Sequence, residues 1–192
     1  KKYYSNTEIF NTFKSNKRIL HKLLEQKIMV FDEYIAKKII KGKYVKSHYP
    51  EYFLPEIRLF KNEKWFPKEE AYDCLSQELI DKINKEELPD DFYENRQTGE
   101  NESLICKFIR NDSVIEFITY VTKNILSLNS EISPSIYETN HFLIKNNDNE
   151  LTLIKYATFF GSIQIFQYLR MNGVELTPSL WLFAIHGKNA DI

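Results

Sequence analysis

Apolar residues recur along most of this 192-residue chain at the three- and four-residue spacing that places them on one face of an α-helix. The clearest stripes, in chain order, lie within residues 9–13, 19–24, 35–40, 72–83, 104–109, 114–121, 153–160, 165–169 and 180–185. Polar and turn-forming residues separate them. The pattern predicts an all-α fold made of short helices.

Capping residues mark the ends of several of these helices. Ser5 or Asn6 stands at the start of the first helix and Asp32 at the start of the third, where a side-chain oxygen accepts a backbone N–H of the first turn. Gly42 is predicted to end the third helix, because glycine adopts the left-handed conformation of a C-cap at low cost. Near the C-terminus, Thr177 followed by Pro178 predicts another helix start.

Residues 43–67 are rich in aromatic residues and proline. The residues concerned are Tyr44, His48, Tyr49, Pro50, Tyr52, Phe53, Pro55, Trp65, Phe66 and Pro67. Because proline limits helix length and aromatic rings favour burial, we expect an ordered loop packed over the helices. Aromatic residues among lysines also occur in proteins that bind single-stranded nucleic acid. The near-neutral net charge and the prolines favour packing, so no nucleic-acid partner is predicted.

A polar, turn-rich segment at residues 89–103 is the best candidate for a domain boundary. Pro89 ends the preceding helical stripe, and Gly99 lies within the segment. We therefore expect a helical N-terminal domain over residues 1–98 and a second domain over residues 99–192.

The first half of the second domain is expected to contain two irregular connections. Residues 126–128 are expected to form an extended linker, and residues 146–149 a polar turn. Between them, Ser133 and Pro134 are predicted to open a short helical piece that runs toward Asn140.

Two stretches, residues 153–161 and 179–187, have nearly the same pattern 26 residues apart, an apolar helical run that ends on a glycine. A fixed period of this size is typical of stacked helical repeats. The small side chains of Ala157 and Ala184 would let neighbouring helices approach closely. The glycine at the end of each stretch is expected to adopt a positive φ, which other residues resist.

In residues 150–187 the chain resembles an ankyrin-repeat array, whose pattern is Thr-Pro-Leu-His-x-Ala-Ala-x-x-Gly followed by a second apolar helix and a glycine-bearing turn. The matching positions are Thr152, Ile154, Ala157 and Gly161, then Ile165, Phe166, Tyr168 and Leu169, and finally Asn172 and Gly173. Leu153, Lys155 and Thr158 depart from the pattern. The period also falls short of the usual one of about 33 residues.

Over residues 103–192 the sequence is similar to the divergent ankyrin-repeat protein family of trichomonad-type protozoa, and more weakly so over residues 19–102. The segments that carry the similarity are residues 48–53, 105–110, 133–140, 159–166, 172–181 and 184–192. The resemblance implies an all-α, ankyrin-like helical-repeat solenoid of stacked antiparallel helix pairs after a helical N-terminal domain. It implies an interaction role and no known chemistry. We also expect further repeats after Ile192, in a number that the sequence does not give.

The sequence contains no recognisable catalytic, cofactor or metal motif. It has no phosphate loop and no Gly-x-Gly-x-x-Gly, and its histidines, His21, His48, His141 and His186, are far apart. No Cys-x-x-Cys or His-x-x-x-His spacing suits zinc. We therefore predict no catalytic residue, no cofactor-binding residue, no metal ligand and no enzyme activity. A deep polar pocket with converging histidines and acids would instead indicate an enzyme.

The two cysteines, Cys74 and Cys106, form no disulfide framework, which favours a reducing compartment and a cytoplasmic location. Cys106 lies on an apolar helix face and is expected in the core, whereas Cys74 is expected to be half-buried. His186, beside a glycine, is expected at a helix C-terminus in contact with backbone carbonyls. No apolar run reaches the roughly 18 residues that a membrane span needs, so no membrane partner is predicted.

Charge is unevenly distributed along the chain. Residues 1–64 hold 15 Lys and Arg against 7 Asp and Glu, a balance of +8, and residues 65–104 hold 4 against 12, a balance of −8. One interpretation is solvated helix faces, and the other is a basic surface that attracts an acidic partner.

The predicted function is a non-catalytic protein–protein interaction scaffold or adaptor with an unidentified protein partner. The alternative is a structural component of a cytoskeletal or flagellar, microtubule-associated assembly, in which the basic residues 1–64 face an acidic filament. Trp181 and Phe183 are expected in the core. An aromatic residue of this pair that lies on the concave surface would instead be a binding anchor.

Overall fold

The computed structural model describes residues 4–41, 48–66, 77–85, 88–147 and 151–190. Within these ranges the regular elements are α-helices, accompanied by one isolated antiparallel β-bridge between Glu131 and Thr152, so the predicted all-α class is confirmed. Gly42, Tyr44, Pro67, Cys74 and the first part of the apolar stripe at residues 72–83 lie outside the described residues.

The chain divides into two compact units, which are called unit 1 (residues 1–100) and unit 2 (residues 101–192). The predicted boundary, between residues 98 and 99, lies two residues before this division. Each unit has its own hydrophobic core.

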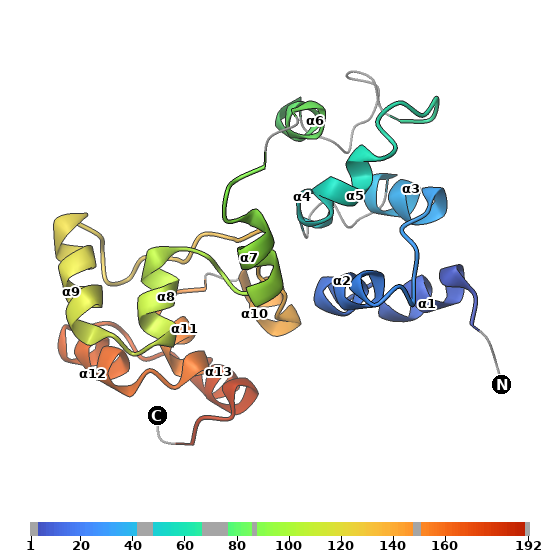
Figure 1. Ribbon diagram of the computed structural model, residues 1–192. Helices are drawn as coiled ribbons and strands as arrows, with labels where there is room; N and C mark the ends of the chain where they lie inside the picture. The colour runs from blue at the N-terminus through green and yellow to red at the C-terminus, as the bar shows by residue number, and fades with distance from the viewer. Residues whose placement is uncertain (1–3, 42–47, 67–76, 86–87, 148–150, 191–192) are drawn as a thin grey trace. The chain divides into compact units, whose positions relative to one another are not determined.

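Unit 1 contains seven of the helices that the structure describes. They are α1 (Asn6–Phe13), α2 (Lys17–Glu25), α3 (Glu33–Lys41), α4 (Tyr49–Tyr52), α5 (Leu54–Arg58), α6 (Gln77–Asn84) and α7 (Phe92–Thr98), labelled in Figure 1. The predicted caps are confirmed. Ser5 Oγ accepts the Glu8 N–H at 3.2 Å in a reciprocal capping box, and Asp32 Oδ1 accepts the Ile35 N–H at 2.9 Å.

The predicted loop at residues 43–67 is wrong where helices α4 and α5 form. Pro50 and Pro55 lie in the first turn of these two helices, where a missing N–H loses no intrahelical bond. The expected burial is confirmed for Tyr49, Tyr52, Phe53 and Phe66. The ring centroid of Phe53 lies 5.8 Å from that of Phe31. The prolines therefore start two short helices instead of excluding helix.

The polar segment at residues 89–103 also contains a helix, α7, that the sequence analysis did not predict. Phe92, Asn95 and Arg96 of this helix are buried. Gly99 ends it in the left-handed conformation, with φ of 71°. Most of this segment is therefore part of the folded structure of unit 1, and the turns lie at the two ends of α7.

Unit 2 contains six described helices. They are α8 (Leu104–Arg110), α9 (Val114–Lys123), α10 (His141–Asn147), α11 (Leu153–Phe160), α12 (Ile163–Met171) and α13 (Leu180–Gly187). The predicted short helix over residues 133–140 is wrong, because α10 begins only at His141. Ser135 Oγ instead accepts the N–H of Tyr137 at 3.0 Å in a local turn, and Asn140 Oδ1 caps α10 by accepting the N–H of Phe142 at 3.0 Å.

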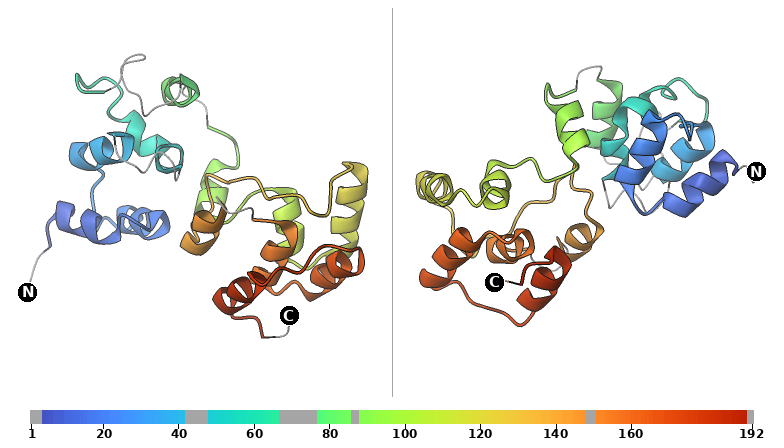
Figure 2. Two further views of the ribbon diagram at one scale, coloured as in Figure 1. Left: turned by 180° about the vertical axis from the view of Figure 1, so that it is seen from behind. Right: turned by 60° about the horizontal axis from the view of Figure 1, so that its bottom comes forward.

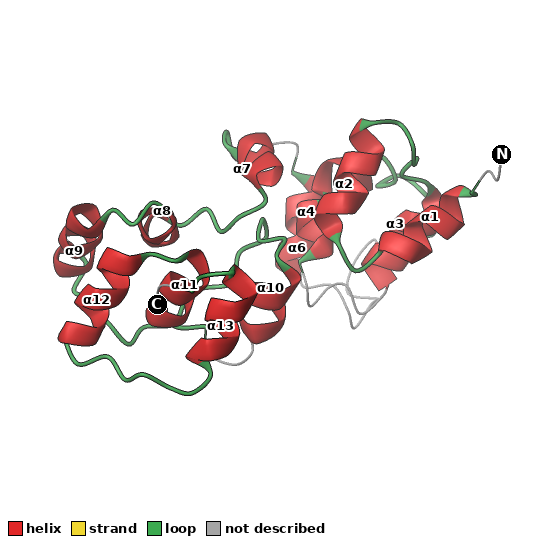
Figure 3. Ribbon diagram, turned by 90° about the horizontal axis from the view of Figure 1, so that it is seen from below, coloured by secondary structure: helices red, strands yellow, loops and turns green. Residues whose placement is uncertain are grey.

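The other helices of unit 2 form two rows. Helix α11 packs between α8 and α13, and these three are the first-row helices; α9 packs against α12, and these two are the second-row helices (Figures 2 and 3). Each first-row helix ends near a residue with positive φ, namely Asp112 (49°), Gly161 (70°) and Lys188 (59°). The three first-row helices therefore end in the same way.

Side chains from these turns connect one first-row helix to the next. The Ser162 hydroxyl donates to the Ile109 carbonyl, and Asn189 Nδ2 donates to the Thr158 carbonyl at 3.2 Å. Ser162 directly follows the positive-φ residue Gly161, and its acceptor Ile109 lies three residues before Asp112, the positive-φ residue of the preceding turn. In the same way Asn189 follows Lys188, and its acceptor Thr158 lies three residues before Gly161. Asp112 in addition accepts two backbone N–H groups in the first turn of α12, both at 3.0 Å. The turns thus carry equivalent contacts at equivalent positions.

The two glycines of the 26-residue period have different roles. Gly161 has φ of +70°, as predicted, whereas Gly187 is the last residue of α13 and the positive φ falls on Lys188. Gly187 is needed for close approach, since a Cβ there would lie 1.9 Å from the carbonyl oxygen of Phe159 in α11. The prediction of a positive φ at Gly187 is therefore wrong. The expected close packing beside the buried Ala157 and Ala184 is confirmed.

The predicted start of α13 is displaced. Thr177 and Pro178 precede a turn, and the helix begins at Leu180 with Ser179 at the N-cap position. The hydroxyl groups of Thr177 and Ser179 are hydrogen-bonded to each other at 2.8 Å. The Thr177 hydroxyl therefore takes part in the turn before the helix and does not cap it.

Candidate functional site

Helix α13 is apolar on both of its faces, which is typical of a helix buried on all sides. Phe183 and Ala184 are buried in the core of unit 2. On the other face, however, Trp181, Leu182 and Ile185 are 71, 54 and 67% exposed. Phe183 is thus in the core as predicted. The prediction that Trp181 is buried is wrong, because Leu180, Phe183 and Ala184 form the buried face of the helix and Trp181 is not part of it.

A groove of about 430 Å³ lies between α12 and α13, beside this exposed face. Its lining is mostly apolar and comes from α11, α12, α13 and the loop that joins the last two: Thr158, Phe166, Arg170, Leu176, Thr177, Pro178, Leu180, Trp181 and Ala184. We call it the α12–α13 groove. Its volume falls within the range of about 300–1,000 Å³ that is usual for binding pockets.

The α12–α13 groove contains one charged side chain. Arg170 is exposed, and within the described part of the chain its guanidinium has neither an ion-pair nor a hydrogen-bond partner. The lining contains no carboxylate, histidine or cysteine. Its chemistry therefore suits binding of an apolar surface that carries a negative charge.

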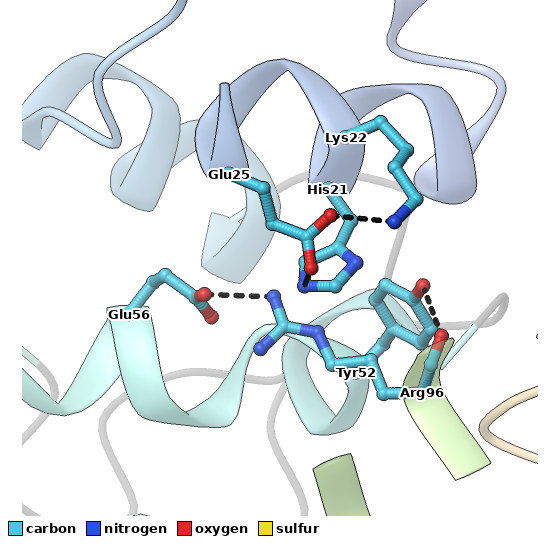
Figure 4. A network of polar contacts seen from close by, with 6 residues as sticks. All are labelled: His21, Lys22, Glu25, Tyr52, Glu56 and Arg96. Carbon is cyan, nitrogen blue, oxygen red and sulfur yellow. Dashed lines mark hydrogen bonds and ion pairs between the residues drawn. The ribbon is translucent and has the colours of Figure 1, made fainter. Parts of the chain in front are cut away.

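A second cluster of polar residues lies inside unit 1, around Arg96 (Figure 4). Arg96 is only 2% exposed; its Nη2 donates to Glu56 Oε1 at 2.7 Å, and its carbonyl oxygen accepts the Tyr52 hydroxyl at 3.2 Å. Its guanidinium also lies over the rings of Tyr52 and Phe53, 5.2 and 5.4 Å from their centroids. Arg96 thus attaches α7 to α4 and α5.

Two titratable groups around Arg96, His21 and Tyr52, are favoured in their neutral forms. Burial, together with the positive charge of Arg96, lowers the pKa of His21 to about 4, although Glu25 nearby acts in the opposite direction. Burial raises the pKa of Tyr52 to about 12. Because Arg96 and Tyr52 are buried, we interpret this cluster as a set of contacts that stabilises the packing of unit 1.

The depressed pKa of His21 predicts a pH dependence of the stability of unit 1. Between pH 6.5 and about 4 the unfolded chain takes up a proton at His21 that the folded chain does not, so the free energy of unfolding should fall as the pH is lowered through this window. Above pH 6.5 this residue should contribute no slope. The measurement is the urea midpoint of unit 1 at pH 7.5, 6 and 5, followed by Trp65 fluorescence in a Trp181→Phe chain.

The variant His21→Gln should lose part of this pH slope, because it removes the titrating group. His141→Gln, in unit 2, is the matched control and should leave the slope of unit 1 unchanged. Identical slopes for the His21→Gln variant and the wild type would show that protonation of His21 does not control stability.

A third cluster surrounds the thiol of Cys106 in unit 2. Cys106 is completely buried, as predicted, and burial raises its pKa to about 11. Burial also raises the pKa of Tyr156, whose hydroxyl accepts a hydrogen bond from Arg110 Nη1 at 2.8 Å. A thiol that stays protonated is a poor nucleophile, so these groups serve packing.

The remaining histidine prediction concerns His186. It lies in the last turn of α13, as expected, and its ring stacks on that of Phe142 with 3.9 Å between centroids. Among the residues that the structure describes, no group of three or more His, Cys, Asp or Glu side chains could hold a metal ion. None of the described helices combines the length and the apolar character that a membrane crossing requires.

Comparisons with family models, with curated proteins and with solved structures gave no match to this chain.

Proposed function

We propose that this chain is a non-catalytic protein-binding scaffold or adaptor, and that the α12–α13 groove is its contact surface. The observation that carries the proposal is the apolar outer face of α13, where Trp181, Leu182 and Ile185 stand exposed beside the groove. Exposed tryptophan next to a pocket is typical of the few residues that supply most of the energy of a protein interface. A large uncovered apolar surface of this kind marks an interaction site.

We further propose that unit 2 is an ankyrin-like helical-repeat solenoid of stacked antiparallel helix pairs. The two rows of helices and the equivalent contacts made by Ser162 and Asn189 support this architecture. In such a stack each helix pair covers its neighbour. The exposed apolar face of α13 and the apolar lining of the groove support the proposed interaction role.

Affinity capture with the full 192-residue chain tests the proposed function. Proteins retained from lysate of the source cells are identified by mass spectrometry, and each is then measured against a Trp181→Ser chain. We expect at least one partner whose binding weakens by about 30-fold, the loss that removal of a central tryptophan produces in other interfaces.

The matched control is Ile115→Ser, which changes an apolar residue of α9 that is 74% exposed. This variant should bind as the wild type does. If Trp181→Ser and Ile115→Ser retain every partner equally well, the groove does not serve protein binding and the proposal is wrong.

A further inference from the structure

We infer that helix α10 is a lid over a slot that binds an aromatic side chain, and that Phe142 occupies this slot in the free chain. The partner is a polypeptide segment that presents an aromatic ring, which takes the place of Phe142 when α10 moves aside. The slot is formed by the rings of Phe159 in α11 and of Phe183 and His186 in α13. None of these residues lines the α12–α13 groove, so the inference does not rest on the proposed function.

Helix α10 belongs to a connection that is longer than the stacking of the helix pairs requires. Residues 124–152 join α9 to α11, whereas residues 172–179 are enough to join α12 to α13. The helix pairs pack directly on each other, α11 on α8 and α12 on α9. Long connections in compact folds are commonly lids or binding loops. The extra residues therefore indicate a role beyond joining two repeats.

The connection is closed at its base, on both sides of α10. The Ile132 N–H donates to the Leu151 carbonyl at 2.7 Å, next to the isolated β-bridge described above. Asn101 Nδ2 donates to the Ser133 carbonyl at 3.0 Å and attaches the first part of the loop to the segment before α8. Because these bonds hold the base of the loop, α10 can leave the surface while the two rows of helices stay packed.

Phe142 fills a slot between equivalent positions of two successive first-row helices. Phe159 and His186 each lie two residues before the positive-φ residue of their turn. The Phe142 ring is stacked on both, 6.0 Å from Phe159 and 3.9 Å from His186 between centroids, and α10 lies beside α11 and α13 in Figure 3. It also meets the Phe183 ring edge-on at 5.0 Å. Such ring geometries favour an aromatic occupant over an aliphatic one. Stacked repeats commonly bind partners through surfaces of this kind, formed by successive repeats.

The slot is accessible at the surface, and α10 is weakly attached above it. Phe142 and Phe159 both remain partly exposed. Among the described helices, none packs along the length of α10. Leu143 is only 1% exposed, so opening requires that Phe142 and Leu143 leave together. Segments with few buried apolar contacts are the ones that open locally while the rest of a fold stays intact.

A synthetic peptide of residues 137–147 tests whether the slot accepts an aromatic ring from outside. The Phe142→Ala chain should bind this peptide at least about 10-fold more tightly than the wild-type chain, in which the tethered Phe142 competes at an effective concentration in roughly the millimolar range. Binding is followed by the NMR signals of the His186 ring, which the ring of the bound phenylalanine should shift. Phe13→Ala, at a 37% exposed phenylalanine of unit 1, is the control chain and should bind as weakly as the wild type.

Two altered peptides test the chemistry of the ligand. A peptide with Phe142→Trp should bind the Phe142→Ala chain, whereas a peptide with Phe142→Leu should bind it about fivefold less well than the original peptide, because leucine loses the ring stacking. Equal binding of the leucine peptide would contradict a slot that selects aromatic rings.

Hydrogen exchange of the wild-type chain tests the lid without any substitution, and it decides the question if Phe142→Ala prevents folding of unit 2. The hydrogen-bonded amides of α10 should exchange at least about 100-fold faster than those of α11 and α12, because they open locally. Equal exchange rates in the three helices would overturn the inference, as would a folded Phe142→Ala chain that binds the peptide no better than the wild type. Neither result bears on partners captured through Trp181, which test the proposed function separately.

Discussion

Replacement of Arg96 by alanine is expected to lower the free energy of unfolding of unit 1 by about 3–5 kcal/mol. The substitution leaves Glu56 without its ion-pair partner and removes the guanidinium from between the rings of Tyr52, Phe53 and Phe92. Since the Glu56 side chain keeps 22% exposure, water can solvate part of it, and we expect the lower half of the range. The measurement is urea unfolding of the Trp181→Phe chain, followed by Trp65 fluorescence.

Arg18→Ala is the matched control, because Arg18 is an exposed arginine of α2 in the same unit. Its effect should stay within about 0.5 kcal/mol, as is usual for surface substitutions. If Arg96→Ala cost no more than Arg18→Ala, α7 would not depend on Arg96 for its attachment to the rest of unit 1.

Gly187→Ala is the second large effect that we expect, with a loss of about 2 kcal/mol in the stability of unit 2. The new Cβ would lie 1.9 Å from the Phe159 carbonyl oxygen, and overpacking against backbone that cannot move aside costs up to about 3 kcal/mol. Alanine returns at most about 1 kcal/mol through its higher helix propensity. Unfolding of the Trp65→Phe chain, followed by Trp181 fluorescence, measures the difference.

The sign of this effect distinguishes a packed α13 from a free helix. In a helix without neighbours, Gly→Ala would raise stability, so a Gly187→Ala chain as stable as the wild type, or more stable, would contradict the packing of α13 on α11. Gly173→Ala is the control for backbone conformation alone, since a Cβ at Gly173 meets no atom within 4 Å but φ is +82°. It should cost about 1 kcal/mol.

The helices and caps that local chemistry determines could be predicted from the sequence. The apolar stripes of α2 and α3 lie where their spacing placed them, and Ser5 and Asp32 cap as their residue types indicate. The same holds for the positive φ of Gly161. These features depend on residues close together in the chain, so their patterns can be read from short segments.

Features that depend on distant residues could not be predicted in this way. Helix α7 has a polar sequence, yet Phe92, Asn95 and Arg96 on it are buried, and Arg96 bonds to Glu56 and Tyr52, forty or more residues away. Gly187 is required because of a carbonyl in another helix, which the glycine pattern alone does not reveal. Both facts emerge only when the helices are packed together.

The candidate groove illustrates the same limit. The apolar character of residues 180–185 is evident in the sequence, and it led to the prediction that Trp181 is buried. Which face of α13 is covered depends on the position of α11, and the groove itself requires α12 as its other wall. The tryptophan could be named as a candidate anchor, but neither the groove nor Arg170 could be found from periodicity.

Hydrogen exchange of the full chain, with and without a captured partner, tests the central claim most directly. We expect slower amide exchange in α12 and α13 when the partner is bound, and we expect this change to be lost in the Trp181→Ser chain. Protection confined to unit 1 or to α8 and α9, with α12 and α13 unchanged, would contradict it.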